Sequence, residues 1–155
     1  MVHPTGGRNL GARSAVAEAI LKLKAQARTN CMATADVDLL RKLAQSEEIE
    51  IVTRQEPKSP PHRTTIWIVP TEKGVYVRSG SRQGRWYREA LANRSVTIRV
   101  GRRRVNARVR RAASRSVIRV VNAAYREKYG AIWPDSATAV VRSSRLHTTL
   151  RLIPF

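Results

Sequence analysis

Short stretches in which apolar and polar residues alternate run through the middle and the end of the chain. A period of two places every second side chain on the same face, as in a half-buried β-strand. Most apolar residues in these stretches are β-branched or aromatic, which strands favour. The pattern predicts six strands, at residues 48–53, 65–69, 74–79, 96–100, 104–110 and 145–153.

Four other segments have apolar residues three or four positions apart, which is the spacing of one helix face. They predict helices at residues 14–28, 34–46, 85–91 and 116–129. Gly130 is expected to end the last helix, and a loop through Pro134 is expected to follow it. The chain then divides into a flexible tail (1–13), N-terminal helices (14–47) and a mainly β domain with helices (48–155).

The order of these elements predicts two antiparallel hairpins. A turn from Pro70 to Gly74 joins strands 65–69 and 74–79, and a turn at Gly101 joins strands 96–100 and 104–110. The strand at 145–153 is expected to close the sheet.

The composition fits one globular domain, and the net charge of that domain is strongly positive. The chain has 155 residues, of which 42% are hydrophobic, and a net charge of +19 from 30 Lys and Arg against 11 Asp and Glu. Such a field favours a nucleic acid, an acidic membrane surface or a phosphorylated cofactor as partner. Cys31 is the only cysteine, so no intrachain disulfide forms. No stretch reaches the ~20 apolar residues of a transmembrane helix, and a cytoplasmic protein is expected.

Arginine is concentrated in the second half of the chain. From Leu91 to Arg126 there are eleven arginines and no acidic residue. Strand alternation places the valines and isoleucine of 96–100 on one face and the arginines on the other. We expect a basic patch that binds nucleic acid without sequence preference, or else a solvated sheet face, made of Arg99, Arg102, Arg103, Arg104, Arg108, Arg110 and Arg111.

The end of strand 74–79 has the chemistry of a phosphate site. Ser79, Gly80 and Ser81 are small and carry hydroxyls, and arginines flank them. Small residues let the backbone approach a ligand, and guanidinium groups pair with phosphate oxygens. The stretch contains neither a P-loop nor a dinucleotide-binding glycine pattern.

Several runs resemble the flavin and deazaflavin split β-barrel superfamily, on its deazaflavin-dependent nitroreductase-like side. The match covers roughly residues 48–109, and an uncharacterised branch is more similar still through Val-Tyr-Val-Arg-Ser and Gly-Arg-Trp-Tyr-Arg. The matching positions are Lys58-Ser59, Arg63-Thr64-Thr65, Trp67, Ser79-Gly80, Trp86-Tyr87 and Leu91-Ala92-Asn93.

The resemblance implies a six-stranded antiparallel split β-barrel preceded by helices, and a homodimer with the cofactor at its interface. It also implies an FMN- or F420-dependent oxidoreductase that reduces a small organic substrate. The expected phosphate ligands are Lys58, Arg63, Ser79 and Arg82. Thr64, Thr65 and Trp67 are expected beside the flavin ring, and Gly80 and Trp86 at the border of the cofactor. No residue is identified as catalytic.

Departures from the family pattern support other interpretations. Pro60 stands where the family has glycine, and Thr65 stands where it has proline. A scaffold without cofactor, or one that binds another ligand such as haem, is therefore a second hypothesis. Trp67 and Trp86 are more typical of core positions, and His147 is more typical of a structural residue than of a catalytic one. The histidines and Cys31 have no metal-ligand spacing.

Overall fold

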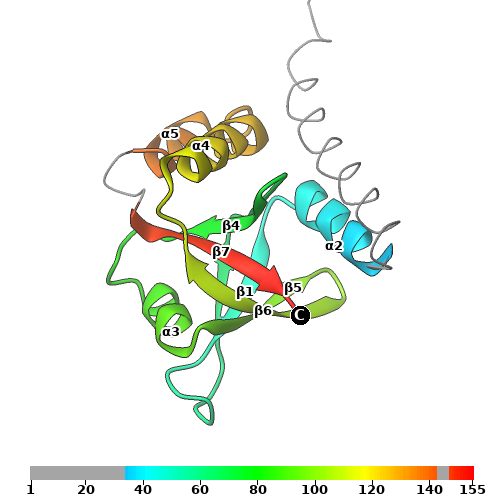
Figure 1. Ribbon diagram of the computed structural model, residues 1–155, viewed down its shortest axis with the longest axis vertical. Coiled ribbons are helices and arrows are strands. Elements are labelled where there is room, and N and C mark those ends of the chain that lie inside the picture. The colour runs from blue at the N-terminus through cyan, green and yellow to red at the C-terminus, as the bar shows by residue number, and fades with distance from the viewer. Residues whose placement is uncertain (1–33, 143–146) are drawn as a thin grey trace, which may run out of the picture.

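A computed structural model describes residues 34–142 and 147–155 (Figure 1). The predicted tail 1–13 and the predicted helix 14–28 lie outside the described residues. The elements are α2 (Thr34–Gln45), β1 (Ile49–Thr53), β2 (His62–Ile66), β3 (Val69–Thr71), β4 (Gly74–Arg78), α3 (Arg85–Asn93), β5 (Ser95–Val100), β6 (Arg103–Arg111), α4 (Arg115–Tyr129), α5 (Pro134–Val140) and β7 (Thr149–Pro154).

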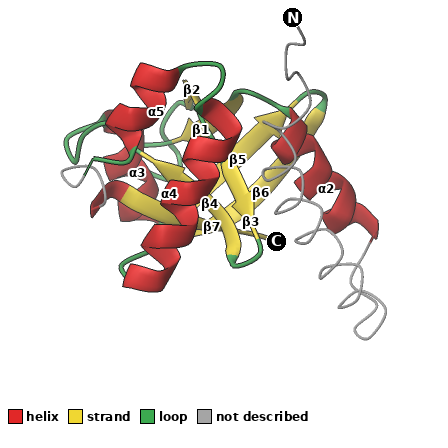
Figure 2. Cartoon of the chain, turned by 90° about the horizontal axis from the view of Figure 1, so that it is seen from above, coloured by secondary structure: helices red, strands yellow, loops and turns green. Residues whose placement is uncertain are grey.

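The described strands form one antiparallel sheet of seven strands, in the order β2-β1-β5-β6-β7-β4-β3. Its two edge strands, β2 and β3, follow one another in the chain with only Trp67 and Ile68 between them. Three residue steps span at most about 11 Å. Both edges must therefore approach each other, and the sheet curls into a half-barrel (Figures 1 and 2).

The α+β class and the antiparallel sheet are confirmed, but the count of six strands is wrong. The predicted strand 65–69 is divided between two strands with different partners. Thr65 pairs with Glu50 on β1, whereas Val69 pairs with Tyr76 on β4. The chain crosses from one edge of the sheet to the other within this run, and alternation alone gives no sign of a change of partner.

Residues 130–133 form the predicted loop, but helix α5, which begins at Pro134, was not expected. Proline is favoured in the first turn of a helix, where the missing N–H needs no partner. Two α-helices, α4 and α5, therefore stand among the described residues between β6 and β7, where one was expected.

The main core fills the inside of the curled sheet. Ile98 and Val96 share the inward face, as predicted, and lie opposite Val105 and Ala107. Helix α3 adds Trp86 and Tyr87, and α2 adds leucines from another side. The central buried residues include Leu43, Ile51, Val77, Ile98, Ala107, Leu150 and Leu152.

Helices α4 and α5 cover the outer side of β3 and β4 with an aromatic cluster. Trp67 stacks on Tyr129 with ring centroids 4.0 Å apart and planes 4° from parallel. Trp133 and Tyr125 extend this stack. Burial raises the pKa of Tyr129, whose hydroxyl donates to the Glu47 carbonyl oxygen at 2.6 Å and accepts from the Ile68 amide.

A buried carboxylate fixes α3 to the start of the barrel. Glu89 accepts hydrogen bonds from the Thr53 hydroxyl at 2.6 Å and from Arg85 Nε at 3.0 Å. Burial alone would raise the pKa of Glu89, but these donors and the charges of Arg85 and His62 hold it below its ordinary value. Helix α3 is thereby held in a defined position beside the cavity described next.

Candidate functional site

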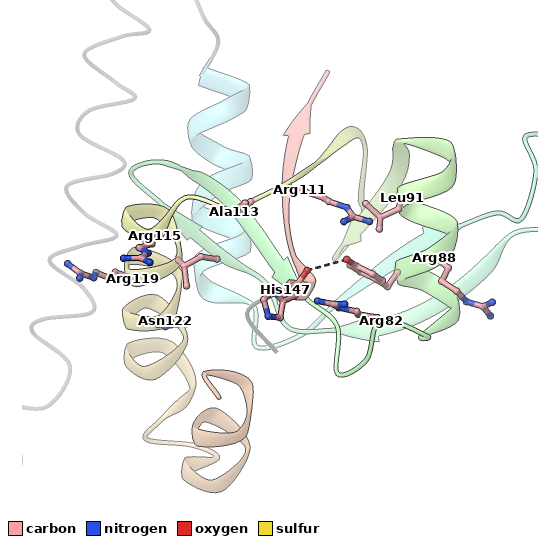
Figure 3. A pocket seen from close by; sticks show the side chains of 12 residues that line it. Arg82, Arg88, Leu91, Arg111, Ala113, Arg115, Arg119, Asn122 and His147 are labelled. Carbon is pink, nitrogen blue, oxygen red and sulfur yellow. Dashed lines mark hydrogen bonds between the residues drawn. The ribbon is translucent and has the colours of Figure 1, made fainter. Parts of the chain in front are cut away.

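A cavity of about 810 Å³ lies between α3, the connection from β6 to α4, and the first turns of α4 (Figure 3). This volume is within the usual range of small-molecule and cofactor sites. The described residues that line it include no acid. Its polar lining consists of Arg82, Arg88, Arg111, Arg115, Arg119, Asn122, Tyr87 and His147, and its apolar lining of Leu91, Ala112, Ala113 and Ile118.

Three of the five arginines follow one another at intervals of four residues. Arg111 ends β6, and Arg115 and Arg119 lie in the first turns of α4. An interval of four places Arg115 and Arg119 on the same helix face. Figure 3 shows this wall of α4 on one side, with Leu91 and Arg88 of α3 on the other and His147 between them.

The start of α4 is an electrostatically unfavourable place for these cations. The N-terminus of a helix carries a partial positive charge that acids normally offset. The first turn of α4 has no acidic residue and begins with Arg115. A bound anion would stabilise both the helix end and the guanidinium groups.

A sixth guanidinium lies behind the cavity wall. Arg78 on β4 is 8% exposed, and burial lowers its pKa. It donates to Asn122 Oδ1, to the Thr149 hydroxyl at 2.7 Å and to the Val140 carbonyl at 3.2 Å. Its Nη2 is buried without a hydrogen-bond partner, and none of the described ion pairs includes it. Asn122 connects this buried charge to the cavity lining.

The predicted phosphate-binding turn is tightly bonded to itself. The buried Ser79 hydroxyl donates to the Ser81 carbonyl at 2.6 Å and accepts from the Ser81 amide. A Cβ on Gly84 would lie 2.9 Å from the Ser79 hydroxyl, so a larger residue there would displace that hydroxyl. Gly80 is exposed. The turn positions Arg82 on the cavity, while the Ser79 hydroxyl is used within the turn.

The other predicted site residues lie elsewhere. Lys58 is exposed in the connection between β1 and β2, and Arg63 on β2 lies 3.8 Å from Glu50. Thr65 is exposed, and the Thr64 hydroxyl is buried without a hydrogen-bond partner. Trp67 packs in the aromatic cluster and Trp86 in the main core. Of the nine predicted residues, Arg82 alone lines the cavity.

Sequence reasoning did not assign Arg88, Arg115, Arg119 or His147 to a site, and it assigned Arg111 to the sheet face. The sequence did contain one signal for this site. Arg111, Arg115 and Arg119 are spaced four residues apart, from the end of a strand into the next helix, and no acidic residue lies between them. Arg82 and Arg88 join this group only through the tertiary fold.

Within residues 34–142 and 147–155, no group of three or more His, Cys, Asp or Glu side chains is placed to hold a metal ion. In the same part of the chain, no helix has the length and apolar character to cross a bilayer.

Solved structures with related folds are described as proteins of different kinds. The haem storage protein HutZ from Vibrio cholerae has a TM-score of 0.57 and 13% identity, over 76% of this chain and 88% of HutZ. An FAD-binding protein from Mesorhizobium loti has a TM-score of 0.52 and 12% identity, over 77% and 88% of the two chains. A pyridoxamine 5′-phosphate oxidase-like protein from Listeria innocua has a TM-score of 0.52 and 14% identity, over 76% and 90%. These likenesses identify the fold as split-barrel-like.

A sequence profile described as "Uncharacterized protein conserved in bacteria (DUF2255)" matches residues 39–152. No curated protein matches the chain.

Proposed function

The chain belongs to the DUF2255 family, and we propose that it binds a phosphorylated flavin-type cofactor, FMN or the deazaflavin F420. The arginine-lined cavity supports this function most directly. Its volume suits a cofactor, and the five arginines that line it are unopposed by any acid in the described lining. The split-barrel-like fold, which an FAD-binding protein shares, is compatible with such a ligand.

The number of arginines favours a ligand with several anionic groups. Guanidinium groups form paired, charge-assisted hydrogen bonds with phosphate and carboxylate oxygens. FMN offers one phosphate. F420, the cofactor that the sequence resemblance implies beside FMN, adds the carboxylates of its tail. We therefore expect F420 to bind more tightly than FMN.

When bound, such a cofactor would supply two-electron reduction of a small organic substrate, and the protein would bind and orient it. In this proposal Arg82, Arg111 and Arg115 hold the anionic end, and Asn122 positions that end through its bond to Arg78.

Titrations with riboflavin, FMN and F420, followed by ligand fluorescence, test the proposal. Riboflavin has the ring of FMN but no phosphate, so it should bind most weakly. The combined change Arg82→Gln, Arg111→Gln and Arg115→Gln should raise the Kd for FMN at least about tenfold, a loss of about 1.4 kcal/mol. The weak binding of riboflavin should stay as it is.

A matched control is the combined change Arg104→Thr, Arg108→Thr and Arg110→Thr, which removes the same charge from the exposed sheet face. It should leave FMN binding intact. Equal losses in both triple variants, or no binding of FMN or F420 by the native chain, would contradict the proposal.

His147 favours haem as a second candidate. Imidazole is a common axial ligand of haem iron, and the arginines could pair with the propionates. The same titration with haemin, followed by the Soret band, separates the two ligands. Haem would be the ligand if the native chain produces a Soret band with haemin, the His147→Ala variant does not, and neither flavin binds.

A further inference from the structure

We propose that the outer surface of β5, β6 and β7 binds the phosphate backbone of nucleic acid. This surface, called the arginine face here, consists of Arg99, Arg104, Arg108, Arg110 and Arg151. Alternate residues of β6 share one side of the sheet, and residues opposed across strands share it too. Figure 1 shows no described helix in front of β6 and β7.

The strand register brings like charges together. Arg99 lies directly opposite Arg104, and Arg110 directly opposite Arg151. Like charges opposed across strands destabilise a sheet. Glu50 offsets one of them, because it lies 3.1 Å from Arg99. None of the described ion pairs includes Arg104, Arg108, Arg110 or Arg151. A bound polyanion would remove the repulsion that remains.

The expected patch of seven arginines is thus revised. Arg111 belongs to the cavity instead, and Arg102 is in the turn between β5 and β6. Arg103 lies opposite Val100, on the same side of β6 as Ala107, and Arg151 is added from β7. Arg110 and Arg111, although adjacent, point to opposite sides of the sheet. The face and the cavity can therefore be changed independently.

The dimensions fit a nucleic-acid backbone. Six residue steps from Arg104 to Arg110 at 3.4 Å cover about 20 Å. One strand of DNA has a phosphate about every 3.4 Å along its axis, so the face covers about six phosphates.

Two other occupants fit less well. A second copy of this chain would set arginines against arginines. An acidic membrane would also need apolar side chains to enter it. Only Ile132 and Phe155 are large apolar residues with high exposure in the described part, and the guanidinium of Arg108 lies 5.5 Å from the centre of the Phe155 ring.

The test is a salt titration of binding to a fluorescently labelled 20-base-pair duplex and to one of its single strands. Log Kd should change linearly with log salt concentration. The combined change Arg104→Thr, Arg108→Thr and Arg110→Thr should reduce the slope by about 2.7 on the duplex and about 2.1 on the single strand. Threonine keeps strand propensity at these exposed positions.

The combined change Arg41→Gln, Lys42→Gln and Arg126→Gln is the charge-matched control, because these exposed residues lie on α2 and α4. It should leave the slope nearly unchanged. Retained FMN binding by the face variant separates this result from the cofactor proposal. The inference is overturned if the native chain does not bind at 50 mM salt, if both triple variants lose slope equally, or if vesicles of acidic lipid bind and nucleic acid does not.

Discussion

Arg78 is a buried cation that holds three elements together. Its guanidinium bonds to Thr149 of β7, to Asn122 of α4 and to the Val140 carbonyl of α5, and its carbon Cζ lies 5.4 Å from the centre of the Tyr125 ring. Burial disfavours the charged form of the guanidinium, so burying Arg78 costs folding free energy. Its bond to Asn122 fixes a side chain that lines the cavity.

We expect Arg78→Ala to lower the free energy of unfolding by about 2–4 kcal/mol, because it leaves a cavity and removes the donor for Asn122 and Val140. Arg78→Met should cost less, since it fills the space and removes the buried charge. Urea denaturation measures both, with the exposed Arg88→Ala as a control that should change stability by less than about 0.5 kcal/mol. A value that small for Arg78→Ala would refute its structural role.

At the level of elements, Lys128 connects α4 to α2 and to the crossing between β2 and β3. Its Nζ donates to the Leu43 carbonyl at 2.8 Å and to the Ile68 carbonyl at 2.6 Å. Burial lowers the pKa of Lys128 from 10.5 to about 7. A neutral amine still has two N–H donors, so it can keep both bonds after losing its proton.

The lowered pKa predicts how stability changes with pH. Between about pH 7 and 10.5 the unfolded chain keeps the proton and the folded chain releases it, so the unfolded state binds more protons. The free energy of unfolding should therefore rise with pH, by up to about 1.4 kcal/mol per unit. Below pH 7 both states are protonated and this contribution is constant.

Chemical denaturation at pH 6.5, 7.5 and 8.5 measures this rise. Lys128→Met should remove it, whereas Lys42→Met, at an exposed position of α2, should keep it. Identical pH profiles for all three proteins would show that Lys128 does not titrate in this range.

Elements with one uninterrupted period were predictable from the sequence. The alternation of β5 and β6 gave their buried valines, and helical spacing gave α2, α3 and α4. The division of residues 65–69 was not predictable, because β2 and β3 differ in partner and not in composition. The cavity was not predictable either, because only the tertiary fold brings Arg82 and Arg88 to the group formed by Arg111, Arg115 and Arg119. Whether Lys58 and Arg63 bind a phosphate stays a prediction.

For the whole molecule, a net charge of +19 affects every association. Attraction to polyanions and repulsion between copies of the chain come from the same field. Salt screens both, since the Debye length falls from about 30 Å at 0.01 M to about 10 Å at 0.1 M. Association with nucleic acid and self-association should therefore respond to salt in opposite directions.

We expect the chain to form the homodimer that its resemblance to split barrels implies, and to form it more tightly as salt rises. Two chains of +19 repel one another at low ionic strength, and the arginine face is a poor dimer interface for the same reason. Sedimentation velocity at micromolar concentration, in 20 mM and 300 mM salt, should show a larger dimer fraction at 300 mM.

The combined change of Arg104, Arg108 and Arg110 to Thr lowers the charge of each chain, so it should shift the low-salt equilibrium toward the dimer. A strict monomer under both conditions would exclude the dimer, and a dimer that dissociates as salt rises would show that ion pairs, rather than apolar contacts, hold it together.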